Sequence, residues 1–360
     1  MSTASPYSDP DKRFTIVPQG GADARAFFRM DAYSAAKAFV EGKFSVCGDL
    51  CAAIRYFSTQ PHSRLRALLF SLAARLQSIR TRSLLGRRKE SAESIQFHYD
   101  RSNEFYAQFL DSRMVYSSAY FRHPAVSLNE AQLEKLHRIC KHLELQAGER
   151  FLDIGCGWGG LITHAAEHYG VTALGCTLSR EQLEFARETV RSRGLSERVT
   201  VEPTDYRDLN GSFDKVASVG MFEHVGRSRL SGYFKKVYSL LGRGGLFLNR
   251  GVLRPHGVSD SPETLFLQKN VFPGGELVHL DDVVREGERA GFAAIGMEDL
   301  RKHYALTCRA WVANLQQHSD RCRALAGEAT YRTWLLYLAA SAVSFEDACT
   351  TAGEVVFVKE

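Results

Sequence analysis

The stretch "FLDIGCGWGG" (151–160) has the pattern of a buried strand that turns through glycines into a helix. Gly155, Gly157 and Gly160 satisfy GxGxxG, in which the missing Cβ atoms let a ligand approach the backbone closely. Such a turn is typical of nucleotide-binding α/β domains. A glycine turn that binds no ligand is the alternative at this point.

Acidic residues near this turn discriminate between nucleotides. An NAD site needs an acidic residue roughly 20 positions downstream, at the end of the second strand. The chain has "GCTLS" (175–179) there, whereas Asp153 precedes the first glycine, as in S-adenosylmethionine-dependent methyltransferases. We therefore predict an S-adenosylmethionine site. A dehydrogenase is the alternative if residues 175–179 do not end the second strand.

Apolar runs alternate with helical or mixed segments from about residue 148 onward. The runs are "RFLDI" (150–154), "VTALGC" (171–176), "RVTVE" (198–202), "FDKVASV" (213–219), "GLFLN" (245–249), "GFAAIGM" (291–297) and "EVVFVKE" (354–360). This alternation predicts an α/β fold with a doubly wound, mostly parallel seven-stranded sheet, Rossmann-like, with helices on both faces.

The composition is that of an ordinary soluble globular protein, with 360 residues, 44% hydrophobic and 24% charged. The eight cysteines lack a CxxC pair, which favours reduced thiols over disulfides or a zinc ribbon. No apolar run approaches the roughly 18 residues that span a bilayer, and no signal peptide is evident. We expect a cytoplasmic protein that touches membranes only peripherally. A net charge of +5 is too small to imply a nucleic-acid partner.

Three sections are expected along the chain. Residues 1–22, rich in Ser, Pro, Asp and Gly, predict a flexible arm. Residues 23–90 predict a small helical N-terminal domain, with helical patterns in 31–44 and 48–57, followed by a basic linker. Residues 91–360 carry the large sheet.

The segment Leu65–Lys89 is amphipathic and basic. Its leucines fall on one helical face, and residues 61–90 hold eight basic side chains against one acidic side chain, Glu90. Such a helix can lie on an anionic lipid surface, where each basic group contributes about 1 kcal/mol. The alternative is a helix packed on its neighbour and a solvated linker.

His164, Glu167 and His168 form HxxEH, a spacing that can bind zinc on one helix face. This helix follows the glycine loop, so its apolar residues should pack on the sheet, and no third ligand is evident. We expect a packed or solvated helix face and no metal.

Six blocks occur in one order: "FHYDRSNEFYAQFLDSRMVYSSAYF" (97–121), "FLDIGCGWGG", "LSREQLEFAR" (178–187), "DYRDLNGSFDKVASVGMFEHVG" (205–226), "VFPGGEL" (271–277) and "HYALTCRAW" (303–311). Together they resemble the cyclopropane-fatty-acyl-phospholipid synthases and the mycolic-acid cyclopropane synthases, which are S-adenosylmethionine-dependent methyltransferases. The resemblance covers roughly residues 90–360 and implies the class I methyltransferase fold. Residues 23–80 resemble the helical, lipid-facing domain of the phospholipid-acting members.

The resemblance also implies which residues hold S-adenosylmethionine. The matching positions are Tyr99, Tyr116, Ser117, Asp153, Gly155, Gly157, Thr177, Leu178, Gln182, Asp205 and Tyr206. Thr177, Leu178 and Gln182 would contact the methionine and ribose portions, and Asp205 and Tyr206 would flank the adenine. For the two tyrosines before the glycine loop, a place in the aromatic core is the alternative.

The family chemistry adds a methyl group to an alkene. This step generates a carbocation, and ring closure then needs a base to remove a proton. In the family that base is a bicarbonate ion, and Glu223 in "GMFEHVG" (220–226) matches the glutamate that orients it. Tyr304 matches a tyrosine at the same anion, and Val252 stands where a backbone amide contributes. His224 is expected in a supporting role.

Two positions depart from the family pattern. The bicarbonate-binding cysteine is Ser118 here, and the expected histidine is Arg250. Serine still donates a hydrogen bond, but a guanidinium is permanently charged. Arg250 either clamps bicarbonate, pairs with Glu223, or points elsewhere if the alignment is shifted by one residue. Altered proton removal would give a methyl-branched or methylene product instead of a cyclopropane.

These observations predict a methyltransferase that acts on the double bond of an unsaturated acyl chain in a phospholipid at the membrane surface. The rivals are a C-methyltransferase of a natural-product pathway and a non-catalytic lipid-binding protein. The sequence leaves open whether the N-terminal domain pairs two subunits into a homodimer.

Overall fold

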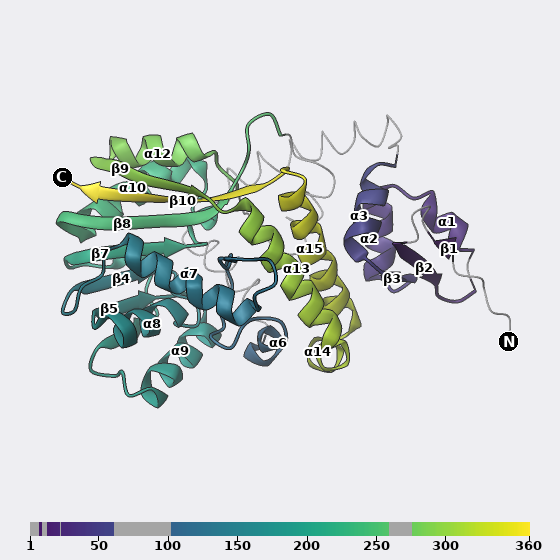
Figure 1. Ribbon diagram of the computed structural model, residues 1–360, viewed down its shortest axis with the longest axis horizontal. Coiled ribbons are helices and arrows are strands. Elements are labelled where there is room, and N and C mark those ends of the chain that lie inside the picture. Colours follow the sequence, from purple (N-terminus) through teal and green to yellow (C-terminus); the bar gives the residue numbers. More distant parts are fainter. Residues whose placement is uncertain (1–6, 9–12, 22, 61–101, 259–275) are drawn as a thin grey trace.

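A seven-stranded sheet forms the larger part of the computed structural model, which describes residues 7–8, 13–21, 23–60, 102–258 and 276–360 (Figure 1). The strand order is β6-β5-β4-β7-β8-β10-β9. The strands from β6 to β8 pair in parallel, and β10 pairs antiparallel with both β8 and β9. The predicted doubly wound, mostly parallel sheet is therefore confirmed. The strands are β4 (Arg150–Ile154), β5 (Thr172–Cys176), β6 (Val199–Glu202), β7 (Phe213–Val219), β8 (Leu241–Leu253), β9 (Phe292–Asp299) and β10 (Thr351–Lys359).

Helices cover both faces of this sheet (Figure 1). One face packs on α7, α8 and α9, through buried residues such as Ile139, Ala165 and Ala186. The other face packs on α10 and α12, through Phe234 and Val283. The helices are α7 (Leu128–His142), α8 (Gly160–Tyr169), α9 (Arg180–Ser192), α10 (Leu230–Leu240) and α12 (Leu280–Arg289), with short 3-10 turns η1 (Tyr206–Asp208), η2 (Phe222–His224) and η3 (Arg227–Arg229).

A third group of helices lies beside the sheet, at the end where the parallel strands finish. α13 and α15 pack against each other, and both lie between the sheet and the N-terminal elements (Figure 1). Their aromatic side chains join those of α6 in one buried cluster. The helices are α6 (Asn103–Ala107), α13 (Arg301–Gln317), α14 (Ser319–Ala326) and α15 (Glu328–Glu346). None of the helices within the described residues is long and apolar enough to cross a membrane.

The N-terminal unit differs from the expected arm and helical domain, because it contains a three-stranded antiparallel sheet with order β1-β2-β3. Phe14 and Ile16 are buried, so part of residues 1–22 is a core strand. Alternating apolar residues in "FTIVP" and "FSVCG" explain these strands. The two predicted helices are present. The elements are β1 (Tyr7–Ser8), β2 (Phe14–Pro18), α1 (Ala24–Phe28), α2 (Ala32–Val40), β3 (Phe44–Gly48) and α3 (Leu50–Ser58).

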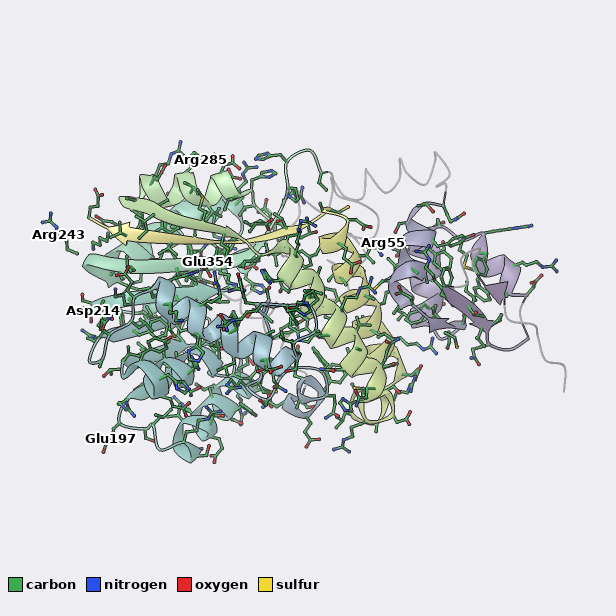
Figure 2. The ribbon with its side chains drawn as sticks, in the orientation of Figure 1. Arg55, Glu197, Asp214, Arg243, Arg285 and Glu354 are labelled. Atoms are coloured by element: carbon green, nitrogen blue, oxygen red, sulfur yellow. The ribbon has the colours of Figure 1, made fainter. Side chains whose placement is uncertain are left out.

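Ionic contacts and hydrogen bonds dock this unit on α15. The buried guanidinium of Arg332 donates to the carbonyls of Phe39 (3.1 Å) and Phe44 (2.7 Å). Arg55 of α3 reaches Asp347 at 2.8 Å, just beyond the end of α15 (Figure 2). The basic segment 61–90, the boundary near residue 91 and Tyr99 lie outside the described residues.

Candidate active site

A cavity lies at the carboxyl ends of β4, β5 and β7, where doubly wound sheets bind their ligands. Its empty volume, including the open mouth, is about 1200 Å³, which is enough for a nucleoside with an amino-acid tail. Nearly all the residues predicted to hold S-adenosylmethionine line it: Tyr116, Ser117, Asp153, Gly155, Gly157, Thr177, Leu178, Gln182, Asp205 and Tyr206.

The glycine loop forms the floor of this donor cavity. Gly155 has φ 81°, and a Cβ atom there would lie 2.9 Å from Cγ of Met221, so only glycine fits. Its N–H donates to the Cys176 carbonyl at 3.0 Å, which fixes the loop to β5. At Gly157 nothing lies within 4 Å of an added Cβ, so the backbone is open toward the cavity.

Asp153 carries a buried carboxylate at the end of β4. Its Oδ1 atom has no hydrogen-bond partner within the described part of the chain. Burial raises the pKa of this carboxyl to about 7, and the positive charge of Lys135 opposes the shift. An orphaned buried acceptor is satisfied by donors of a ligand, such as an amine or ribose hydroxyls. The lining therefore fits S-adenosylmethionine.

Lys135 of α7 is a site residue that sequence reasoning missed. It is only 2% exposed, lines the cavity, and donates to Oγ of Ser117 at 3.0 Å. Burial lowers the pKa of its ammonium to about 7, and the nearby Arg250 lowers it further. The sequence signal that could have identified Lys135 is a lysine on the apolar side of an amphipathic helix, beside Leu136 and Ile139.

The remaining donor-side residues are held by local contacts. Thr177 donates to Oε1 of Gln182 at 2.8 Å, which joins the end of β5 to α9. The Asp205 carboxylate caps η1 and binds the guanidinium of Arg207 at 2.8 Å and 2.5 Å. Tyr116 packs its ring 5.1 Å from that of Trp311, so it belongs to the aromatic cluster and to the cavity wall.

Glu223 lies on η2, directly after β7 and next to the cavity wall formed by Met221 and His224. Its Oε1 accepts a hydrogen bond from the Val252 amide at 2.7 Å, and its buried Oε2 has no partner among the described residues. Burial raises the pKa of this carboxyl to about 7, while the Val252 amide opposes the shift. Gly251 permits this approach, because a Cβ there would lie 2.7 Å from Oε1.

Arg250 pairs with Glu354, which rules out the expected alternative of a pair with Glu223. The register of β8 and β10 places Arg250 opposite Glu354, which Figure 2 labels. The two side chains approach to 3.5 Å. Arg250 also donates to the carbonyl of Ser118 at 2.9 Å. The Ser118 hydroxyl itself donates to the Ala119 carbonyl at 3.0 Å. Both departures from the family pattern are therefore engaged in internal contacts.

Tyr304 of α13 stacks on Phe345, with ring centroids 4.4 Å apart, and meets Trp311 edge-on at 6.2 Å. Burial lowers the pKa of Arg250, and Glu354, Glu298 and Tyr304 oppose the shift, so Tyr304 lies near the guanidinium. The aromatic cluster thus extends from the donor cavity past Tyr304.

Both histidines of the HxxEH pattern on α8 pack beside His137, and their own ring centroids lie 4.5 Å apart. His164 is buried, with Nε2 3.2 Å from Nδ1 of His137. Glu167 binds Arg193 at 3.1 Å, and the side chain of His168 is 48% exposed. His164 therefore contributes to packing against α7.

Comparison with known proteins finds methyltransferases and a cyclopropane synthase among the similar proteins. A probable fatty acid methyltransferase of Pseudomonas putida is 42% identical over 328 residues, covering 89% of this chain and 81% of that protein. A sphingolipid C9-methyltransferase of Komagataella phaffii is 30% identical, and the match covers 89% of this chain and 68% of that protein. Among solved structures, the mycolic acid cyclopropane synthase CmaA1 in complex with SAH and CTAB superposes with a TM-score of 0.71 at 30% identity. The superposition covers 74% of this chain and 98% of that chain.

The family model described as mycolic acid cyclopropane synthetase matches residues 86–353, most of the chain. This match confirms the resemblance found in the sequence and favours a methyltransferase over a dehydrogenase. The chain belongs to the mycolic acid cyclopropane synthetase family and is an S-adenosylmethionine-dependent methyltransferase.

Proposed function

We propose that this methyltransferase adds a methyl or methylene group to the carbon–carbon double bond of an unsaturated fatty acyl chain. The observation that carries the proposal is the carboxylate of Glu223, buried next to the donor cavity with one oxygen unpartnered and a pKa of about 7. Proton removal after methyl transfer to an alkene needs such a base within reach of the reacting carbons. The names of the relatives support an acyl acceptor.

The aromatic cluster suits the proposed acceptor. S-adenosylmethionine, when bound, supplies the methyl group from its sulfonium. Once an alkene carbon has taken this group, the neighbouring carbon is cationic, and water would trap it. The rings of Tyr116 and Tyr304, which are partly buried, both contact the buried ring of Trp311 beside the cavity. Ring faces stabilise a cation without reacting with it.

The residues assigned to bicarbonate do not fit a ready-made anion site. The Val252 amide donates to Glu223, the Ser118 hydroxyl donates to the Ala119 carbonyl, and Arg250 binds Glu354 and the Ser118 carbonyl. Nε of Arg250 is a buried donor without a partner among the described residues, so it is the group that these contacts leave for a second anion. The unpartnered Oε2 of Glu223 is itself a proton acceptor of suitable pKa.

We assign Glu223 the role of direct base. Its Oε2 takes a proton, and the electron pair of the broken C–H bond forms the new carbon–carbon bond. If the proton leaves the transferred methyl group, that electron pair closes a cyclopropane ring onto the cationic carbon. If the proton leaves a chain carbon next to the cation, the product is a methyl-branched alkene. If a hydride first shifts from the methylated carbon to the cationic carbon, proton loss from the methyl group gives a methylene compound.

The acceptor is proposed to be a phospholipid at the inner membrane surface. An apolar pocket between α2, α3 and α15 supports this proposal, because it presents apolar side chains of the N-terminal unit that a lipid can contact. It is lined by Ala32, Tyr33, Ala35, Ala36, Phe39, Phe44, Val46, Leu50, Ala53, Ile54, Phe57, Ser58, Leu336 and Ala340. In this proposal the N-terminal unit and the basic segment 61–90 hold the protein peripherally on the membrane, and residues 91–360 carry out the chemistry.

A vesicle assay tests the proposal. Purified protein and S-adenosylmethionine are mixed with phospholipid vesicles that carry oleoyl or stearoyl chains, and the acyl chains are analysed by mass spectrometry. We expect modification of the oleoyl chains alone. A parallel reaction with an unsaturated sphingolipid checks the second candidate acceptor, which the Komagataella phaffii relative favours. Modification of the sphingolipid but not of the oleoyl phospholipid would move the assignment to that lipid class.

A further inference from the structure

Two imidazoles and a carboxylate gather where the chain leaves β8 and begins α12. His256, His279 and Asp281 each offer a ligand atom, and these atoms all lie within 4.8 Å of one another. Nε2 of His256 lies 3.0 Å from Oδ1 of Asp281. The two imidazole rings stack with centroids 4.3 Å apart and an interplanar angle of 7°. The hydrogen bond from the Arg254 amide to the Val278 carbonyl (2.9 Å) brings the two chain segments together.

The tautomer of His279 is set by its backbone contact. Its Nδ1 lies 2.9 Å from the carbonyl oxygen of Arg254. A carbonyl oxygen only accepts, so Nδ1 carries the proton and Nε2 keeps its lone pair. A ring whose Nδ1–H is held by a backbone carbonyl is the usual arrangement of a metal-binding histidine. This contact is independent of the clustering of the three side chains.

One carboxylate oxygen of Asp281 faces the imidazoles. Arg285 binds Asp282 closely and lies 3.9 Å from Oδ2 of Asp281, which leaves Oδ1 toward His256. A second cluster, His142 with Glu298 and Glu354, offers one imidazole and two carboxylates. There, however, Arg138 already binds Glu298 at 2.8 Å and Arg250 pairs with Glu354. The first cluster is therefore the better cation site.

We propose that His256, His279 and Asp281 bind one divalent transition-metal ion of the zinc type. Imidazole nitrogen and carboxylate oxygen are established ligands of such ions, and three protein ligands leave a position for water. The bound ion would tie the end of β8 to the first turn of α12.

This site adjoins the proposed base through the backbone. The Glu276 amide donates to the Glu223 carbonyl at 3.3 Å, and the Glu276 carboxylate accepts from the Arg227 amide at 2.9 Å. Residues 276–279 thus connect the metal ligands with the turn that carries Glu223. The ion would fix the ends of the segment between His256 and His279 and would take no part in proton removal.

Metal titration tests the site without relying on activity. Tag-free protein with Cys47→Ser and Cys349→Ser, which removes the two exposed thiols, is titrated with Zn²⁺ by calorimetry and with Co²⁺ by visible absorption. We expect one site, weakened at least about tenfold by His256→Ala and by Asp281→Asn. His256 has a side chain 75% exposed, so its replacement should leave folding unchanged. His123→Ala is the matched control and should bind as the parent does.

Two results would overturn the proposal. One is the absence of a cobalt ligand-field band and of binding heat at millimolar metal in the parent protein. The other is Zn²⁺ affinity in His256→Ala and Asp281→Asn that equals the affinity of the His123→Ala control, with all three proteins folded by circular dichroism.

Discussion

The Glu223 carboxylate accepts a hydrogen bond from the Val252 amide at 2.7 Å, and its second oxygen has no protein partner among the described residues. One oxygen therefore fixes the orientation of the group, while the other is free to take a proton. No basic side chain contributes to the pKa shift of Glu223, which burial raises to about 7. The arrangement suits a base that works near neutral pH.

Glu223→Gln should abolish the base and preserve the shape of the turn. We expect product formation to fall by roughly 10²–10⁴-fold, the usual contribution of a general base, with unchanged affinity for S-adenosylmethionine. Since the base must be ionised, the wild-type rate should rise with pH through about 7. Initial rates and donor binding measured between pH 5.5 and 8.5 check both points. A residual rate in the variant with the same rise through neutral pH would assign the proton transfer to another group.

Asp153→Asn tests the donor cavity. The amide keeps the shape of the carboxylate but loses its charge and replaces one acceptor oxygen with a donor. A hydrogen bond to a charged group contributes about 1.5–3 kcal/mol, so S-adenosylmethionine should bind roughly ten- to a hundredfold more weakly. Calorimetric titration with S-adenosylhomocysteine provides the measurement. Wild-type affinity in this variant would place the ligand away from β4.

Glu354→Gln should destabilise the fold, because it leaves the guanidinium of Arg250 buried without its carboxylate. Arg250 and Glu354 are only 3% and 2% exposed, and breaking a buried pair typically costs about 3–5 kcal/mol. Adding Arg250→Met should recover most of this loss, since both charges are then absent. Urea unfolding of the single and double variants gives the free energies. Equal destabilisation by both would show that the charges do not interact.

His164 should make the protein sensitive to acid. Burial, together with the neighbouring His137, lowers the pKa of this imidazole to about 3. The unfolded chain takes up the proton near pH 6.5, whereas the folded chain does so only near the lowered value. Stability is therefore lost as the pH falls from about 6.5 to 3, by up to about 1.4 kcal/mol per pH unit for this group.

The variant His164→Gln removes this titration. Its unfolding free energy should decline less steeply than that of the wild type between pH 6.5 and 5, even though the substitution itself costs stability. The exposed His123→Gln serves as the control and should follow the wild-type slope. An identical slope in all three proteins would mean that His164 is not kept neutral by burial.

Most of the sheet and the donor cavity could be predicted from sequence, because their signals are local. The glycine loop fixes β4 and α8, and Asp153, Thr177 and Gln182 occupy positions defined by the strand ends next to it. Short strands are harder to predict from sequence than the strands next to the glycine loop. β2 and β3 lie among glycines, prolines and helical neighbours, and their core role depends on pairing with each other.

Contacts between segments that lie far apart in the sequence leave no local sequence pattern from which they could be predicted. The pairing of Arg250 with Glu354 follows from the register of two strands that are far apart in sequence. The place of Lys135 next to Ser117 depends on how α7 packs on the sheet. Of the alternatives for Arg250, the pair with Glu223 was wrong for this reason, since the sequence does not show which residue of β10 lies opposite Arg250.

The most direct test of the account is the fate of a methyl-deuterated donor. Wild-type protein is incubated with S-adenosylmethionine carrying a trideuterated methyl group and oleoyl phospholipid vesicles in bicarbonate-free buffer, and the acyl chains are analysed by mass spectrometry. We predict labelled acyl chains without added bicarbonate, with two deuterium atoms retained in a cyclopropane or a methylene product and three in a methyl-branched alkene. Label that is absent from the acyl chains, or that enters them only after bicarbonate is added, would contradict methyl transfer to this alkene with Glu223 as the direct base.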